Sequence, residues 1–356
     1  MPPRGVGPYE ILSLVGRGGV GTVYRARHRD TGRIAAVKLL GPAPSTDASS
    51  TRRLAREFEA LARLDHPNVV RVFEAGVAEG YSFLAMELVE GLDLRAWLSP
   101  VLDLGLAPPA ANDGAAPGPA FGLDALAMEP DTESFFSGST GELGPEAVRS
   151  FAALLDEPET DPGRAVSRLP ADLPADAAAA PRPPSEEWLA ALNRPARVER
   201  LVHAIRQVCD ALAYVHAQGL VHRDLKPSNI MVDDGRRVRL MDFGLVKPVR
   251  EERPGTRAAV VGTYRYMAPE QARGGPLDGR ADLYALGVIL WELLAGRPPF
   301  PVPALRMRHL GSTAAPPLRE ANPGAHPRLV AIAERLLQRD PGRRYQRAEE
   351  VRDALP

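Results

Sequence analysis

The first 90 residues alternate short apolar segments with turn residues, a pattern typical of β-strands. The segments are rich in Val, Ile, Leu, Ala and Tyr. Asp30-Thr31-Gly32 is a turn signal between two of them. The pattern predicts five strands, at residues 9–15, 22–27, 33–40, 69–73 and 81–87.

Apolar residues recur at helical spacing in three other segments. Within residues 51–64 they are Leu54, Phe58 and Leu61. A longer helix is predicted to run from Val198 to His216 and to end at Gly219, a residue favoured just after helices. A third helix begins at Asp282, and its core face is formed by Leu283, Leu286, Ile289, Leu290 and Leu293.

The stretch from Ser99 to Glu187 breaks both patterns. It is rich in Ala, Pro and Gly, and it holds 16 acidic and 4 basic residues, a net charge of −12 in a chain whose total is −1. A long stretch without periodicity is typically disordered or functional. Two interpretations remain open: a tethered loop, or a docking segment that folds onto the basic remainder of the chain. Only residues 146–155 have the pattern of a short amphipathic helix.

The bulk composition of the 356 residues excludes several classes of protein. Hydrophobic content of 44% and charged content of 25% are ordinary for a soluble globular protein. The net charge gives no indication of nucleic-acid binding, no segment reaches the ~20 apolar residues of a membrane span, and the N-terminus lacks a signal-peptide core. We therefore expect a cytoplasmic protein with no nucleic-acid partner. The single cysteine, Cys209, excludes an intramolecular disulfide and is expected in the core.

A glycine-rich stretch, G-R-G-G-V-G-T-V, follows the first predicted strand at residues 16–23. Gly16, Gly18 and Gly21 would let backbone N–H groups approach phosphates closely. A dinucleotide-binding loop has the same glycine spacing but opens into a helix. Because a β-prone segment follows here, the pattern argues against a dinucleotide-dependent oxidoreductase. It leaves a strand–loop–strand phosphate clamp or a plain hairpin turn.

The residues with the most specific chemistry lie in H-R-D-L-K-P-S-N, residues 222–229. Asp224 can accept the proton of an incoming hydroxyl group, Lys226 can hold a phosphate oxygen, and Asn229 offers an amide oxygen to a hard cation such as Mg²⁺. A D-F-G sequence follows after a predicted hairpin, and its Asp242 is a second candidate cation ligand. The alternative is a polar loop between a helix and a strand.

Taken together, these motifs resemble the bacterial eukaryotic-like (Hanks-type) Ser/Thr protein kinases, over nearly the whole chain except the acidic insertion. The resemblance implies an α+β, bilobal protein-kinase fold, in which a five-stranded antiparallel N-lobe sheet carries one main helix. The C-lobe would be mostly helical and would contain the long acidic, disordered insertion. The implied boundaries are 9–88 for the N-lobe, 89–100 for the hinge and the start of the C-lobe, 101–187 for the insertion and 188–356 for the C-lobe.

The resemblance also implies the cofactors ATP and Mg²⁺ and their ligands. Asp224, Lys226 and Lys38 are the implied catalytic residues, and Asn229 and Asp242 are the implied metal ligands. The implied ATP-binding residues are Gly16, Gly18, Gly21, Val23, Ala36, Lys38, Glu57, Met86, Glu87, Val89, Asn229 and Asp242.

Within this set, Glu57 is the implied ion-pair partner of Lys38, with Glu59 as the alternative. Met86 would lie behind the adenine, and the backbone of Glu87 and Val89 would bond to the base edge. Asp93 is a candidate for the ribose.

Further residues match the family pattern outside the nucleotide site. Thr256 is the only Ser or Thr at residues 245–261, the implied activation loop, and phosphorylated Thr256 could pair with Arg223. An unmodified loop threonine is the alternative. Asp282 is implied to hold backbone N–H groups of the catalytic loop, and Arg344 is implied to pair with Glu270.

The resemblance implies transfer of the γ-phosphoryl group of ATP to Ser or Thr hydroxyl groups of protein substrates, with autophosphorylation and a role in signalling. The alternative is a nucleotide-binding pseudokinase or autoinhibited scaffold that works through the acidic insertion. That alternative predicts damage to at least one of four residues, and none is damaged: Lys38, Asp224, Asn229 and Asp242.

Overall fold

A computed structural model of the chain describes residues 4–18, 21–42, 61–78, 81–100, 184–243, 265–300 and 314–356. The chain divides into two compact units, residues 1–120 together with 180–356, and residues 121–179. All described residues belong to the first unit. The predictions for most of the helix at 51–64, for residues 101–183 and for Thr256 lie outside the described residues.

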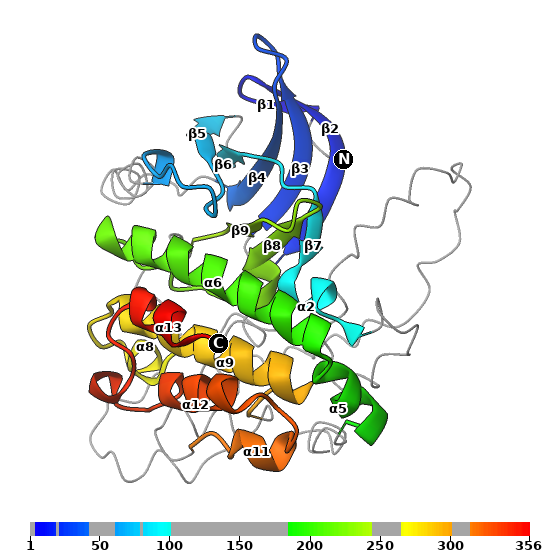
Figure 1. The fold of residues 1–356 in the computed structure, drawn as a ribbon. Helices are drawn as coiled ribbons and strands as arrows, with labels where there is room; N and C mark the ends of the chain where they lie inside the picture. Colours follow the sequence, from blue (N-terminus) through cyan, green and yellow to red (C-terminus); the bar gives the residue numbers. More distant parts are fainter. Residues whose placement is uncertain are drawn as a thin grey trace, which may run out of the picture. The chain divides into compact units, whose positions relative to one another are not determined.

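The N-terminal strands form one antiparallel sheet (Figure 1) in the order β1-β2-β3-β4-β6-β5. Within the described residues this sheet has six strands, one more than predicted. The extra strand β1 has two residues, too few to produce an apolar pattern, and Gly7 turns it into β2 with a φ of +54°, a conformation that favours glycine. The strands are β1 (Gly5–Val6), β2 (Tyr9–Gly18), β3 (Gly21–His28), β4 (Ile34–Pro42), β5 (Val72–Ala78) and β6 (Tyr81–Met86).

The strand predicted at residues 69–73 begins later, at Val72. The backbone N–H of Val70 donates to the carbonyl of Leu240 at 2.9 Å, and the N–H of Leu240 donates to the carbonyl of Asn68 at 2.8 Å. The predicted start was therefore wrong because these apolar residues pair with a strand far along the chain.

The two faces of this sheet pack differently. Successive side chains of a strand point to opposite faces, so alternate residues of β4 contribute to the two faces in turn. Ala35 and Val37 belong to a small core of the sheet, whereas Ala36, together with Leu84 and Met86 of β6, belongs to the large core that continues into the helical part. Lys38 has the same strand parity as Ala36, which places it on that face.

The C-terminal part is mostly helical, as predicted. None of the helices in the described ranges combines the length and the apolar character that crossing a membrane requires. The helices are α2 (Leu94–Trp97), α5 (Glu186–Leu192), α6 (Pro195–Ala217), α8 (Pro269–Ala272), α9 (Gly279–Ala295), α11 (Leu318–Ala321), α12 (Pro327–Leu336) and α13 (Ala348–Ala354), with 3-10 turns η4 (Pro227–Asn229) and η5 (Pro341–Arg343).

Helix α9 is buried along nearly its whole length and packs against α6 and α12 (Figure 1). Asp278 caps its first turn by accepting from the N–H of Arg280 at 2.9 Å, and Gly296 ends it with a φ of +68°. Gly287 permits the close approach of α12, because a Cβ there would lie 2.7 Å from the Cβ of Leu336. Cys209 of α6 is fully buried, which confirms the predicted core thiol, and burial raises its pKa.

A three-stranded sheet lies next to residues 222–229, the predicted catalytic loop, which is called the catalytic loop below. Its strands are β7 (Gly91–Asp93), β8 (Ile230–Asp233) and β9 (Val238–Leu240), and the predicted hairpin joins β8 to β9. Strand β7 was not predicted. Gly91 allows it to pair, because a Cβ at this position would lie 2.2 Å from the carbonyl oxygen of Val232.

The buried side chain of Arg197 joins three elements of the helical part. Its guanidinium donates to the carbonyl of Leu98 at 2.7 Å, of Leu192 at 3.0 Å and of Leu293 at 2.9 Å. Leu98 lies just before the interior stretch 101–183, and Leu192 lies soon after it. One side chain therefore links the residues that flank this stretch, Leu98 and Leu192, to Leu293 of α9.

Candidate functional site

The segment between α6 and β8 brings the three predicted catalytic-loop residues together. The Nζ atom of Lys226 lies 2.8 Å from Oδ2 of Asp224. The amide nitrogen of Asn229 donates to the backbone carbonyl of Asp224 at 2.8 Å and to its Oδ2 at 3.2 Å. Asp224 is therefore fixed by two neighbours of its own loop, while Asn229 is itself buried in the turn η4.

Asp282, near the start of α9, accepts hydrogen bonds from the backbone of this loop. Its two carboxylate oxygens accept from the N–H of His222 at 2.8 Å and from the N–H of Arg223 at 2.9 Å. Arg223 has a φ of +66°, a left-handed conformation that is strained for a residue with a side chain. The predicted anchoring role of Asp282 is confirmed, and the anchor maintains the strained residue that directly precedes Asp224.

The carboxylate of Asp282 also lies 2.8 Å from Nε2 of His216 in α6. Burial by itself would raise the pKa of Asp282, but the bonds from His216 and the nearby His222 outweigh it and hold the pKa below its ordinary value. The anchor is therefore a carboxylate at neutral pH, the form that can accept from all three donors.

His222, the first residue of the catalytic loop, is fully buried and packs against the D-F-G segment. Its Nε2 lies 2.9 Å from the carbonyl oxygen of Met241, and its ring packs on that of Phe243 at a centroid distance of 4.6 Å. Burial lowers the pKa of His222, although three neighbouring carboxylates act in the opposite direction: Asp282, Asp224 and Asp242.

We expect His222 to make the folded protein less stable in mild acid. Its pKa is about 6.5 in the unfolded chain and lower in the folded state, so the unfolded state binds more protons as the pH falls below about 6.5. This group should lower the free energy of unfolding by up to about 1.4 kcal/mol per pH unit. Urea unfolding between about pH 7.5 and 5 measures the slope.

The slope should be shallower in His222→Gln and unchanged in His203→Gln, which alters an exposed position of α6. Equal slopes for all three proteins would contradict the assignment to His222.

Lys38 and Asp242 meet across the two parts of the site, where Nζ of Lys38 lies 2.8 Å from Oδ1 of Asp242. Both side chains are largely buried, and Asp242 has a φ of +53°, a second strained position. Among the described residues, the anionic partner of Lys38 is thus Asp242. The predicted partners Glu57 and Glu59 lie outside the described residues.

The donor atoms near Asp242 suit a hard cation. A carboxylate oxygen of Asp242 and the amide oxygen of Asn229 are the ligand types that Mg²⁺ prefers. The contacts of Asn229 with other described residues, including one to the carbonyl of Asp242 at 3.4 Å, use its amide nitrogen and leave its oxygen for a cation. Among the described residues no three His, Cys, Asp or Glu side chains form a metal cluster.

The glycine-rich segment forms a hairpin. Gly16 pairs with Val23 and Gly18 with Gly21, so a strand follows the loop. The predicted strand–loop–strand arrangement is confirmed, and the arrangement of a dinucleotide-binding loop, in which a helix follows, is excluded.

The predicted adenine-site residues lie on adjacent strands. Val23 of β3 pairs with Lys38 of β4, and Ala36 of β4 pairs with Met86 of β6. Both Ala36 and Met86 are buried. These strands therefore bring the lysine and the expected adenine-binding positions to one region of the sheet.

The segment after β6 limits what its residues can bind. The N–H of Glu87 donates to the carbonyl of Arg71 at 2.8 Å and is therefore already engaged, and the side chain of Glu87 lies 3.3 Å from that of Arg239. The carboxylate of Asp93 caps α2 by accepting from the N–H of Ala96 at 2.8 Å. Asp93 thus has a structural role, whereas the ribose contact predicted for it stays a prediction.

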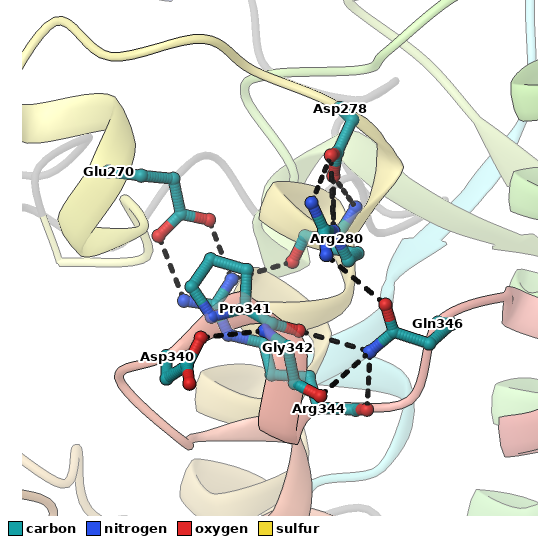
Figure 2. A network of polar contacts seen from close by, with 8 residues as sticks. All are labelled: Glu270, Asp278, Arg280, Asp340, Pro341, Gly342, Arg344 and Gln346. Carbon is teal, nitrogen blue, oxygen red and sulfur yellow. Dashed lines mark hydrogen bonds and ion pairs between the residues drawn. The ribbon is translucent and has the colours of Figure 1, made fainter.

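The predicted pair of Glu270 with Arg344 is confirmed, and it stands at the centre of a polar network (Figure 2). The two guanidinium nitrogens of Arg344 donate to the two carboxylate oxygens of Glu270 at 2.6 and 2.8 Å. Arg344 is almost fully buried and also donates to the carbonyl of Arg280 at 2.9 Å. The pair therefore fixes α8, which follows the predicted activation loop, to η5 and α9.

A second cluster was missed by the sequence reasoning. Glu292 of α9 accepts from the hydroxyl of Tyr266 at 2.7 Å and from Arg95 of α2 at 2.5 Å, and Arg95 also donates to the Tyr266 hydroxyl at 2.8 Å. The available signal was a single acid within the apolar run around Leu290–Leu294, because a buried carboxylate requires a partner.

Comparison with known proteins agrees with this geometry. Residues 9–352 match the family model described as protein tyrosine and serine/threonine kinase. The chain is 30% identical to the serine/threonine-protein kinase pkn3 of Myxococcus xanthus over 98% of its own length and 49% of that protein, and 28% identical to PknB of Mycobacterium leprae over 99% of its length and 43% of that protein. The chain thus spans less than half the length of these curated relatives.

A solved structure supports the fold alone. The kinase domain of PknI from Mycobacterium tuberculosis superposes with a TM-score of 0.58 at 24% identity, covering 98% of this chain and 96% of that one.

Proposed function

Because the chain belongs to the protein tyrosine and serine/threonine kinase family, we propose that it transfers the γ-phosphoryl group of ATP to Ser and Thr hydroxyl groups of proteins. The observation that carries the proposal is the fixed geometry of Asp224. Lys226 contacts its carboxylate and Asn229 contacts its backbone carbonyl, both at 2.8 Å. The preceding residue, Arg223, is anchored through its backbone N–H. Such a site works mainly by positioning the reactants and neutralising charge.

In this proposal Asp224 orients the acceptor hydroxyl and takes its proton. Lys226, already beside that carboxylate, contacts a γ-phosphate oxygen. Lys38 leaves Asp242 for the α- and β-phosphates, while Asn229 and Asp242 hold Mg²⁺. When bound, Mg²⁺ neutralises charge on the phosphates.

The preference for Ser and Thr over Tyr rests on two arguments. The loop sequence Lys226-Pro227-Ser228 resembles that of Ser/Thr kinases, and the curated relatives are named serine/threonine-protein kinases. Protein substrates and a cytoplasmic location belong to the same proposal.

The pseudokinase alternative has little support in the described site. It predicts a defective residue among four, and all four are present: Lys38, Asp224, Asn229 and Asp242. Lys38 contacts Asp242, and Asp224 is contacted by Asn229 and by Lys226 of its own loop, each at 2.8 Å. Neither the identity nor the arrangement of these residues favours a loss of catalytic activity.

Incubation with γ-labelled ATP and a generic protein acceptor, with and without Mg²⁺, tests the proposal. We expect label on Ser or Thr only when Mg²⁺ is present, with mass spectrometry mapping any label on the chain itself, including at Thr256. Nucleotide binding without transfer to any acceptor would contradict the proposal and favour the scaffold alternative.

A further inference from the structure

The cluster of Arg95, Tyr266 and Glu292 presents the guanidinium group of Arg95 at the surface. The side chain of Glu292 is 8% exposed, whereas that of Arg95 is 53% exposed. Tyr266 is buried, and burial and the adjacent Glu292 raise its pKa, so it stays neutral. The carboxylate is therefore on the inside, and the half-exposed guanidinium is the part of the cluster that a ligand can reach.

This cluster lies beside the catalytic loop. Tyr266 lines the same small cavity as Asp224 and Arg223. Helix α2, which carries Arg95, packs against the turn η4 that contains Asn229. The element that carries Arg95 and the cavity wall that holds Tyr266 therefore both adjoin the loop that carries Asp224.

The partners of Arg95 fix the orientation of its guanidinium group. One guanidinium nitrogen, Nη2, serves both the carboxylate of Glu292 and the hydroxyl of Tyr266. A guanidinium has five N–H donors in a planar fork, so donors that bond to no other described residue remain on its exposed side. These donors match the oxygens of a carboxylate.

We infer that Arg95 is a specificity-determining residue that binds an acidic side chain of the protein substrate near the acceptor Ser or Thr. The inference rests on the proposed function and adds a substrate class to it. Glu292 holds Arg95 in place, so an acidic substrate residue gains a partner that is already ordered, whereas a basic residue meets a like charge.

Peptides that share one Ser acceptor and carry a single Glu or Lys, moved one position at a time on either side of it, test the inference. We expect the native chain to prefer Glu at one or more positions, as a higher kcat/KM. The Glu-to-Lys preference should fall about fivefold in Arg95→Gln, the factor of one partly exposed ion pair. It should be retained in Arg95→Lys and should weaken as salt is added.

Arg352→Gln is the matched control, because Arg352 is also a partly exposed arginine that pairs with an acid, Asp210, but lies on α13. Its preference should equal that of the native chain. If Arg95→Gln lowers transfer to Glu and Lys peptides equally, Arg95 is only a structural residue and the inference is wrong. If no peptide is phosphorylated by the native chain, the proposed function itself fails.

Discussion

Replacing Asp224 by Asn is expected to lower the rate of phosphoryl transfer by a factor of about 10² to 10⁴, the usual contribution of a general base. The asparagine keeps the shape of the side chain and can still accept a hydrogen bond from Lys226, which lies 2.8 Å from the carboxylate. Its amide cannot take the proton of the acceptor hydroxyl. The loss should therefore appear in kcat, with little change in the affinity for ATP.

Initial rates with labelled ATP and a titration of nucleotide binding separate these two quantities. Asp234→Asn is a suitable control, because it makes the same chemical change at an exposed residue of the β8–β9 turn. Full activity of Asp224→Asn would refute the assigned role. Equal losses in Asp224→Asn and Asp234→Asn would indicate a general effect of the substitution.

The second large effect is expected at Arg197, where Arg197→Ala should lower the free energy of unfolding by about 3 kcal/mol or more. The substitution leaves the carbonyls of Leu98, Leu192 and Leu293 without the donor that each now has. A buried polar group without a partner costs about 1 to 3 kcal/mol. Urea unfolding followed by circular dichroism measures the loss.

Two further variants make this test specific. Arg194→Ala removes an exposed arginine from the start of the same helix and should change stability by no more than about 0.5 kcal/mol. Arg197→Lys should give an intermediate loss, because a compact ammonium group cannot span three carbonyls as a planar fork does. Identical stabilities of Arg197→Ala and Arg194→Ala would show that the three bonds contribute nothing.

The parts of the site that could be predicted are those with a dense local signal. Asp224, Lys226 and Asn229 lie within six residues, so one loop brings them together whatever the rest of the chain does. The pairing of Glu270 with Arg344 is a long-range contact, and only the resemblance to a family implied it. The structure confirms it as a two-bond pair.

Other features leave little trace in the sequence. Arg197 bonds only to backbone carbonyls in the contacts described above, and every residue offers such a carbonyl. The two-residue β1 is shorter than any apolar period. The partner of Lys38 depends on how the sheet and the D-F-G segment meet, which propensities do not encode. Apolar patterns therefore predict the elements better than the polar contacts between them.

The brace made by Arg197 has a consequence for how this fold can change over evolutionary time. Since Leu98 and Leu192 bond to the same guanidinium, the described residues on either side of the interior stretch are held at a fixed distance from each other. Doubling the length of a flexible connection costs only about 0.6 kcal/mol of closure entropy. We therefore expect changes in the number of residues between Leu98 and Leu192 to leave the catalytic loop in place. Insertions and deletions should be tolerated at this position, in evolution as in engineering.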